Sequence, residues 1–249
     1  MKILAIIPAR YDSSRFPGKP LIDIQGKSMI QRVYEQVKKA ILVTDVIVAT
    51  DDQRIYDMVM SFGGQVMMTS KDHQSGTDRC GEVITSKPNY DVIINVQGDE
   101  PLVQPSQIDE VLSLFSKPSV KIATLVKEVK ENTELFNPNR IKVVLNDKNE
   151  ALYFSRQAIP FLANTPKEKW LETAKFWKHI GIYAWTKNTL KDIIQLAPTT
   201  LEKQESLEQL RWLFHGYAIQ TIETTIETPN IDTPEDLKKV LQVLNSNQN

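Results

Sequence analysis

Cysteine is almost absent from this chain of 249 residues, in which Cys80 is the only one. A single cysteine excludes an intramolecular disulfide and any cysteine-rich zinc cluster. Because Cys80 falls in a segment with a helical pattern, we expect a buried structural thiol there. The chain must therefore be held together by its apolar core, for which its 41% of hydrophobic residues suffice.

Long apolar runs are absent too. The opening run covers residues 3–7 and ends before Pro8 and Arg10, which makes it shorter than the roughly 7 to 15 residues of a secretory core. No window approaches the roughly 18 apolar residues of a membrane span. We therefore expect a cytoplasmic protein with no membrane partner.

Neither sign of charge is in excess, since 30 Lys and Arg residues face 31 Asp and Glu residues, a net charge of −1. This balance argues against a partner that is a nucleic acid.

Two nucleotide-binding motifs are also missing. No G-x-G-x-x-G occurs, and Gly26-Lys27-Ser28 lacks the earlier glycine of a Walker A loop because position 21 is Leu.

The first half of the chain alternates short β-rich runs with helical patterns. Near-continuous apolar strands of this kind predict a parallel sheet covered by helices on both faces. The length fits one large α/β domain, or such a domain with a smaller annex. We predict strands at residues 2–7, 45–50, 65–68, 91–97 and 122–126, and helices at 29–40, 52–62, 77–86 and 106–115.

After about residue 130 the pattern becomes a mixture of strands and helices. Two of the strands are separated by four polar residues, which favours an antiparallel pair. Thr233 and Pro234 form a typical helix start before the last element. We predict strands at 141–145, 151–154, 178–184 and 219–223, a long helix at 201–215 and a closing helix at 234–244.

Residues 8–20 are the most informative stretch, and they follow the first predicted strand directly. They carry Arg10, Arg15 and Lys19 and only one acid, Asp12. Several prolines and a glycine stiffen the stretch and fix where the cations point. Three fixed cations at the carboxyl end of a strand suit a polyanion such as a triphosphate. A solvated basic loop is the alternative interpretation.

Two carboxylates lie at predicted strand ends on the same side. Asp99 follows the apolar strand 91–97, and Asp232 precedes the closing helix. Carboxylate oxygens suit Mg²⁺, which also binds substrate phosphates. The two therefore form a candidate metal pair, although Asp99 could simply form a turn and Asp232 could simply cap a helix.

Two further segments place polar residues where ligands bind. Ser75 and Gly76 open a predicted helix, whose N-terminus attracts negative charge, although a plain helix cap needs no ligand. His179, Gly181 and Tyr183 share one face of a predicted strand, with His179 and Tyr183 about 13 Å apart along it. A structural role for the lone histidine is the alternative there.

Taken together, these segments resemble one family, the 3-deoxy-manno-octulosonate cytidylyltransferases, also called CMP-KDO synthetases. The departures from the family pattern are Asp12 for a usual Gly, Phe16 for a usual Leu, and Trp185 where a smaller residue is common. We call residues 8–20 the phosphate loop, and an acid at position 12 could weaken nucleotide binding there. The resemblance covers nearly the whole chain, in P-A-R-Y-x-S-[ST]-R-x-P-G-K-P-L (8–21), A-T-D-D (49–52), S-G-T-D-R (75–79), N-V-Q-G-D-E-P (95–101), A-L-Y-F-S-R (151–156), H-I-G-I-Y-A (179–184), L-E-Q-L-R (207–211) and D-T-P-E-D-L (232–237).

The resemblance implies a single nucleotidyltransferase domain. Its α/β fold has a mostly parallel, Rossmann-like central sheet flanked by helices, with a smaller mixed α+β portion. Residues 1–130 then mainly bind the nucleotide, 131–232 mainly bind the sugar and form a homodimer, and 233–249 are the C-terminal helix and tail. The implied reaction transfers CMP from CTP to the anomeric hydroxyl of 3-deoxy-D-manno-octulosonate and releases pyrophosphate, for lipopolysaccharide biosynthesis.

The resemblance also assigns roles to residues. Arg10, Lys19 and Asp99 are expected to be catalytic, and Asp99 and Asp232 to hold Mg²⁺. Arg156 is expected to pair with the carboxylate of the sugar acid. The expected nucleotide contacts are Ala9, Arg10, Arg15, Lys19, Ser75, Gly76 and Arg79, and the expected sugar contacts are Gln97, Arg156, His179, Tyr183, Glu208 and Gln209.

Alternatives stay open at this stage. The acceptor could be a related acid, such as 8-amino-3,8-dideoxy-manno-octulosonate or a sialic acid. A non-catalytic nucleotide sensor is more remote, because the metal carboxylates and loop cations that such a sensor loses are all present. Glu208 could also form an ordinary surface pair with Arg211, three residues further on.

Overall fold

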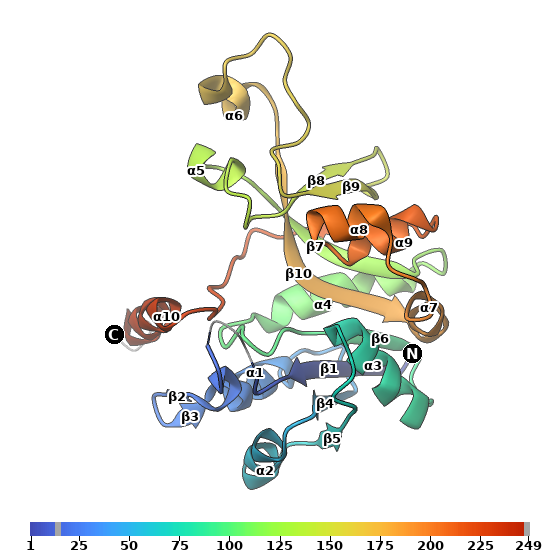
Figure 1. Cartoon of the computed structure of the whole chain (residues 1–249), viewed down its shortest axis with the longest axis vertical. Helices are drawn as coiled ribbons and strands as arrows, with labels where there is room; N and C mark the ends of the chain where they lie inside the picture. Colours follow the sequence, from blue (N-terminus) through green and yellow to red (C-terminus); the bar gives the residue numbers. More distant parts are fainter. Residues whose placement is uncertain (13–15, 247–249) are drawn as a thin grey trace.

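The computed structural model describes residues 1–12 and 16–246. At its centre lies a sheet of nine strands, seven of which follow the order β11-β7-β10-β6-β1-β4-β5, with β8 and β9 attached through β10 (Figure 1). A two-stranded hairpin stands apart from it. The strands are β1 (Ile3–Ala9), β2 (Asp23–Ile24), β3 (Lys27–Ser28), β4 (Asp45–Thr50), β5 (Val66–Met68), β6 (Val92–Asn95), β7 (Ile122–Glu128), β8 (Lys142–Leu145), β9 (Ala151–Ser155), β10 (Trp177–Thr186) and β11 (Gln220–Glu223).

The predicted α/β fold with a central sheet flanked by helices is confirmed. Strand β1 pairs in parallel with β4 and β6, β4 pairs in parallel with β5, and β11 with β7. The antiparallel pair predicted around residues 146–149 is also present, as β8 and β9. One feature was not predicted: β10 lies in the middle of the main sheet, antiparallel to both β6 and β7.

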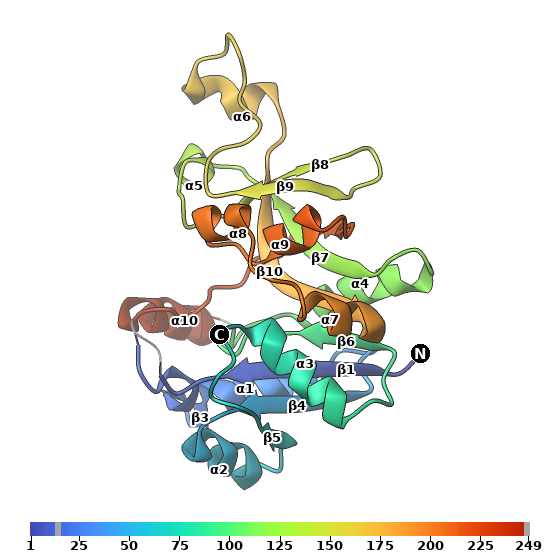
Figure 2. The ribbon, with the colours of Figure 1, turned by 45° about the vertical axis from the view of Figure 1, so that its right-hand side comes forward.

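Helices cover both faces of the sheet (Figure 2). One face packs against α1, α2 and α4, and the other packs against α3, α7 and α9. Strand β1 serves both sides because its residues alternate, with Ile3 and Ala5 in the first cluster and Leu4 and Ile6 in the second. The longer helices are α1 (Met29–Val37), α2 (Gln53–Ser61), α3 (Gly76–Ser86), α4 (Pro105–Ser113), α7 (Lys187–Ile193), α8 (Thr200–Glu205), α9 (Gln209–Phe214) and α10 (Pro234–Ser246).

The long helix predicted at 201–215 is wrong, because two helices, α8 and α9, occupy that segment. Ser206 ends α8 in the left-handed conformation, with φ 52°. The guanidinium of Arg156 donates to the carbonyl oxygens of Glu205 and Ser206, at 2.6 and 3.3 Å. These bonds hold the break in place, and the break turns the start of α9 toward the sheet.

Helix α10 begins as predicted and brings the C-terminal segment to the phosphate loop. The amide of Asp236 donates to the Thr233 hydroxyl, and the Asp236 carboxylate accepts from the Thr233 amide. Ile231 and Val240 pack against Ile24 in a separate apolar cluster. Asp232 is therefore held close to residues that come from the first tenth of the sequence.

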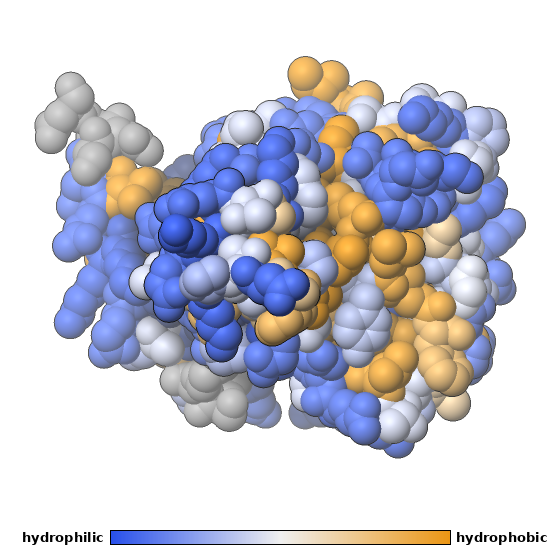
Figure 3. Space-filling view, turned by 90° about the horizontal axis from the view of Figure 1, so that it is seen from above, coloured by the Kyte–Doolittle hydropathy of each residue, from blue (hydrophilic) through white to orange (hydrophobic). Residues whose placement is uncertain are grey.

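A protruding segment between β9 and β10 forms one end of the molecule (Figures 1 and 2). Trp170 anchors it by stacking on Phe176, with ring centroids 5.7 Å apart. Figure 3 looks at the molecule from this end and shows a band of apolar side chains in the right half of the view. The short helices of the structure are α5 (Asn132–Leu135), α6 (Trp170–Thr173), η1 (Lys19–Leu21), η2 (Leu114–Ser116) and η3 (Lys167–Lys169).

Cys80 lies in α3 with none of its surface exposed, and burial raises the pKa of its thiol well above the usual range. The predicted buried structural thiol is confirmed. Within the described residues, no helix combines the length and the apolar character that a membrane crossing requires.

Candidate active site

Lys19 is the centre of the candidate site. Its ammonium lies 2.6 Å from Asp99 Oδ2 and 3.3 Å from Asp232 Oδ1, and it also donates to the Ile231 carbonyl oxygen at 3.2 Å. Lys19 lies on η1 after β1, Asp99 follows β6, and Asp232 precedes α10. Strands β1 and β6 are parallel neighbours, so both of their carboxyl ends meet at this edge.

The arrangement of the two carboxylates fits a divalent cation. Asp99 and Asp232 already converge on one positive charge, the ammonium of Lys19, and their side chains are 23% and 29% exposed. Among the described residues there is no group of three or more His, Cys, Asp or Glu that could hold a metal on its own. The pair of Asp99 and Asp232 suits Mg²⁺, which binds through one or two carboxylates and takes further oxygens from substrate phosphates.

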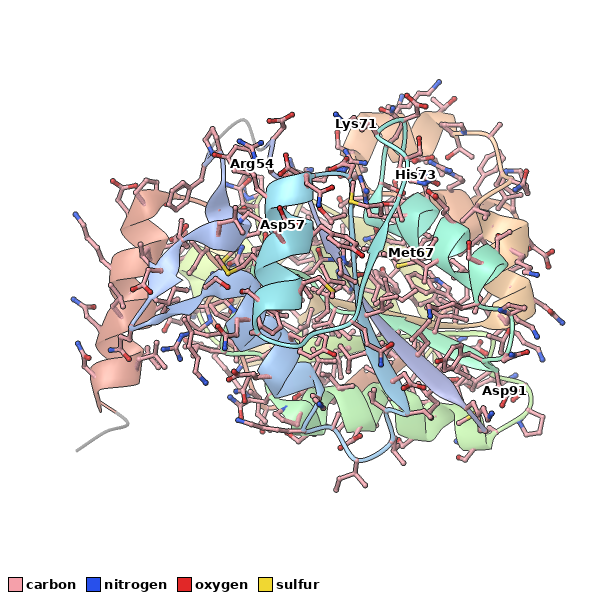
Figure 4. The ribbon with its side chains drawn as sticks, turned by 90° about the horizontal axis from the view of Figure 1, so that it is seen from below. Arg54, Asp57, Met67, Lys71, His73 and Asp91 are labelled. Carbon is pink, nitrogen blue, oxygen red and sulfur yellow. The ribbon has the colours of Figure 1, made fainter. Side chains whose placement is uncertain are left out.

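Arg10 extends the cationic edge toward the loop between β5 and α3. Its guanidinium donates to the carbonyl oxygen of His73, whose imidazole Nε2 lies 2.5 Å from Glu82 Oε2. Figure 4 shows His73 in that loop. Burial of the Glu82 carboxyl group tends to raise its pKa, but hydrogen bonds from Ser70 and His73 outweigh this effect and lower the pKa. The loop that holds Arg10 is thus fixed to α3. Arg15, the third predicted cation, lies outside the described residues.

The phosphate loop closes on an aromatic ring. Gly18 has φ +72°, a conformation that favours glycine, and a Cβ there would lie 3.1 Å from the Tyr11 ring, so that the ring would have to shift. Arg54, at the start of α2 (Figure 4), stacks its guanidinium 3.2 Å from the centroid of that ring and also pairs with Asp52. Asp12, the acid that departs from the family pattern, is exposed beside this stack.

The start of α3 has the geometry predicted for it. Ser75 caps the helix in a capping box with Asp78. A Cβ on Gly76 would lie 3.4 Å from the side chains of Asn95 and Pro8, so the glycine lets the helix start approach β1 and β6. Ala9, at the end of β1, is buried beside this approach. The predicted nucleotide contacts Ala9, Ser75 and Gly76 therefore lie together.

Arg79 has a structural role that its sequence motif did not indicate. Its side chain is fully buried, and its guanidinium donates to Asp51 Oδ2 at 2.7 Å and to the Thr69 hydroxyl. Asp51 follows β4 and Thr69 follows β5. Arg79 thus ties α3 to the ends of two strands, and a contact with nucleotide stays a prediction.

A strand irregularity brings the predicted sugar residues His179 and Tyr183 into contact. In the β10–β7 pairing the register shifts between Ile180 and Tyr183, so that His179 and Tyr183 face positions two residues apart on β7. Their ring centroids are 4.9 Å apart. The expected separation of about 13 Å along the strand assumed a regular strand, whereas four steps of β10 here pair with only two steps of β7.

Thr124 on β7 lies between these rings and the backbone of the irregular segment. Its hydroxyl donates to the Ile182 carbonyl oxygen at 2.7 Å and lies 2.9 Å from His179 Nε2. Burial lowers the pKa of His179 to about 3, which keeps the imidazole neutral.

Glu208 and Gln209 lie at the start of α9 on the same side of the sheet. Thr77 donates to Glu208 Oε2 at 2.6 Å. Burial raises the pKa of Glu208, and the hydrogen bond from Thr77 opposes that shift. Gln209 is 6% exposed. The proposed surface pair of Glu208 with Arg211 is wrong, because Arg211 pairs with Glu202 at 2.5 Å.

Gln97 and Arg156 occupy different surroundings. Gln97 donates to the Gly181 carbonyl oxygen at 3.3 Å, which joins the end of β6 to the irregular part of β10. The guanidinium of Arg156 donates to backbone carbonyl oxygens of Pro138, Glu205 and Ser206. Gln97 thus lies with the predicted sugar residues. Arg156 is held by the backbone, and its pairing with a sugar carboxylate stays a prediction.

The sequence interpretation missed Thr124, Thr77 and Asn95. Asn95 is 5% exposed and faces Tyr183 across the β6–β10 pairing. Among the described residues, Asn95 Oδ1 and the Tyr183 hydroxyl are both buried without a hydrogen-bond partner. A polar Asn at the end of an apolar strand was the one signal that could have indicated a site residue.

Known proteins resemble this chain over most of its length. A family model described as cytidylyltransferase matches residues 4–225. A 3-deoxy-manno-octulosonate cytidylyltransferase of Cytophaga hutchinsonii is 55% identical over 243 residues, which is 96% of each chain. One of the same name from Parabacteroides distasonis is 53% identical over 249 residues and 98% of each chain.

Solved structures agree with these relatives. A CMP:2-keto-3-deoxy-manno-octonic acid synthetase in complex with CTP matches with a TM-score of 0.92 and 43% identity, over 99% of this chain and 100% of that one. A 4-diphosphocytidyl-2C-methyl-D-erythritol synthase from Anaerococcus prevotii has a TM-score of 0.65 at 13% identity, over 98% of each chain, which shows the fold alone. On the family model and the relatives at about half identity, this chain belongs to the 3-deoxy-manno-octulosonate cytidylyltransferase family.

Proposed function

We propose that this protein transfers CMP from CTP to the anomeric hydroxyl of 3-deoxy-D-manno-octulosonate and releases pyrophosphate. The observation that carries the proposal is the convergence of Lys19, Asp99 and Asp232 at the carboxyl ends of β1 and β6. The curated relatives bear the name of this activity, and a synthetase of similar structure binds CTP. Those names favour neither an amino-sugar acid nor a sialic acid as the acceptor. They do not favour a non-catalytic nucleotide sensor either.

The reaction is a displacement at the α-phosphorus of CTP. The anomeric oxygen forms a bond to that phosphorus, the bond to the oxygen bridging the β-phosphate breaks, and pyrophosphate leaves with the electron pair. The hydroxyl proton passes to solvent. In such a reaction the protein mainly positions groups and neutralises charge. Lys19 and Arg10 neutralise the charge on the departing pyrophosphate.

We propose Asp99 and Asp232 as the residues that hold Mg²⁺. When bound, the ion polarises the α-phosphate and favours ionisation of the attacking hydroxyl. Ala9, Ser75 and Gly76 line the nucleotide side. The sugar acid is bound on the other side by Gln97, His179, Tyr183, Glu208, Gln209 and Arg156.

A homodimer is part of the proposal, and the apolar end of the molecule supports it. Phe161 in the protruding segment, Leu152 on β9 and Phe214 on α9 are 74%, 57% and 62% exposed. A second copy covering this end removes exposed apolar surface of the kind that monomers rarely keep. Sedimentation of the protein and of Phe161→Ser checks it, with a smaller species expected for the variant. We further propose that the protein acts in the cytoplasm, in lipopolysaccharide biosynthesis.

Pyrophosphate release tests the activity directly. CTP, UTP and ATP are each combined with 3-deoxy-D-manno-octulosonate, its 8-amino-8-deoxy analogue and a sialic acid, with and without Mg²⁺. We expect release only from CTP, only with a sugar acid, and with the hydroxylated octulosonate as the preferred acceptor. A preference for the amino sugar overturns the substrate but keeps the cytidylyltransferase. Binding of CTP without release for any acid favours the sensor.

A further inference from the structure

Residues 224–232 follow β11 and end at Asp232, and this segment is anchored at its start. The Thr224 amide donates to the Val126 carbonyl oxygen at 2.9 Å, and Lys127 donates to the Thr225 carbonyl oxygen at 3.0 Å. Gln107, which is 1% exposed, donates to the Ile226 carbonyl oxygen at 3.2 Å. We call residues 224–232 the strap.

The strap is also anchored at its far end, inside the candidate site. The Ile231 amide donates to the Asp99 carbonyl oxygen at 2.9 Å, and its own carbonyl oxygen accepts from Lys19 at 3.2 Å. The Ile231 side chain is fully buried among apolar residues. These contacts place Asp232, the next residue, beside Asp99 and Lys19.

Lys178 holds the strap at Glu227, directly after the first anchors. It lies on β10, only 2% of its side chain is exposed, and its ammonium contacts the carboxylates of Glu134 on α5 and Glu227 on the strap. Glu227 has a second, weaker partner in Arg140, at 3.7 Å. The pair of Lys178 and Glu227 is thus a charge-assisted contact between the central sheet and the strap, five residues before Asp232.

We propose that Lys178 is a positioning residue for the active site: through Glu227 it holds the strap so that Asp232 lies beside Asp99 and Lys19. The ammonium touches neither CTP nor the sugar in this proposal. A strap that moves at Glu227 loosens Ile231 and carries the Asp232 carboxylate away from Asp99. The inference rests on the proposed function, since it takes Asp232 as the second carboxylate of the metal pair.

Glu134 provides a matched control, because it contacts the same ammonium but lies on α5 and not on the strap. Glu227→Gln weakens the link to the strap and leaves the pair of Lys178 with Glu134 intact, whereas Glu134→Gln does the reverse. Arg140→Gln tests the second partner of Glu227. Hydrogen exchange of the strap amides in the free protein is the first readout, and the Mg²⁺ concentration for half-maximal pyrophosphate release is the second.

We expect Glu227→Gln to speed exchange across residues 227–232 and to raise the half-saturating Mg²⁺ concentration about tenfold, as residues that orient metal ligands commonly do. Glu134→Gln and Arg140→Gln should leave both readouts near those of the unaltered protein. Equal responses of the two glutamate variants, or unchanged exchange in Glu227→Gln, overturn the proposal. If the unaltered protein releases no pyrophosphate, the proposed function fails, and the exchange comparison still decides how the strap is held.

Discussion

Lys19 and Asp99 lie 80 positions apart in the sequence, yet the ammonium of one is 2.6 Å from the carboxylate of the other. The parallel pairing of β1 and β6 accounts for this proximity, because each residue follows the carboxyl end of one of those strands. Asp232 reaches the same ammonium from a segment near the other end of the chain. Substrate phosphate and metal would therefore meet a site made from three separate stretches.

Asp99→Asn should keep the fold and lose most of the activity. The amide has nearly the shape of the carboxylate but lacks the charge that holds a metal, and a metal contributes several kcal/mol to such a reaction. We expect turnover to fall by about 100-fold or more. Pyrophosphate release over a range of Mg²⁺ concentrations measures this. Asp57→Asn, on the exposed face of α2 (Figure 4), is the control, and near-normal turnover of Asp99→Asn at limiting Mg²⁺ would remove Asp99 from the metal site.

Lys19→Ala should lower turnover by roughly two to three orders of magnitude, as the loss of a donor to developing phosphate charge does. Lys27→Ala is the matched control, since Lys27 pairs with Glu35 on the surface and its side chain is 43% exposed. Arg15→Ala should have a milder effect than Lys19→Ala. Single-turnover rates with saturating CTP make the comparison. Weak and equal effects of Lys19→Ala and Arg15→Ala would make the loop an ordinary solvated surface.

Arg79→Ala should destabilise the protein by about 3 kcal/mol, because it leaves the Asp51 carboxylate without its partner in a poorly solvated place. Arg54→Ala removes an arginine that also pairs with an aspartate, but on the surface with 57% of its side chain exposed, and it should change stability little. Urea unfolding of both variants at one pH makes the comparison. Equal stability losses would contradict the structural role of Arg79.

Local elements were predictable from the sequence because their signals are local. Apolar periodicity gave the strands and longer helices, and Thr233 and Pro234 marked the start of α10. The place of β10 between β6 and β7 was not predictable, since strand order depends on packing between distant segments. The left-handed Ser206 that divides the predicted long helix is held by Arg156, which follows β9, and no local pattern reports such a contact.

The residues of the candidate active site were also only partly predictable from the sequence. Lys19, Asp99 and Asp232 could be predicted as one cluster because all three follow or precede regular elements at one sheet edge. The resemblance to a family supplied most of the sugar residues, because strand spacing grouped only His179 and Tyr183. Thr124 was missed because its role arises from the irregular pairing of β7 and β10, and a sequence without an alignment does not reveal that irregularity.

His179→Ala should raise the KM for the sugar acid much more than the KM for CTP. The imidazole lies against Tyr183 and Thr124, and a site built from buried polar groups loses affinity when one of them is left unpaired. Steady-state kinetics with each substrate varied in turn separate the two constants. His215→Ala, at an exposed histidine, serves as the control. A larger change in the KM for CTP would place His179 on the nucleotide side.

The burial of His179 also predicts how stability depends on pH. Its pKa falls from 6.5 to about 3 in the folded protein because burial disfavours the charged imidazole. Between these two values the unfolded chain binds a proton that the folded protein does not, so the free energy of unfolding must decrease as the pH falls through this window. We expect a smaller decrease between pH 7 and 5 for His179→Phe than for the unaltered protein, and an unchanged one for His215→Phe. Urea unfolding at several pH values measures it, and parallel curves for all three proteins would show that His179 is not held neutral.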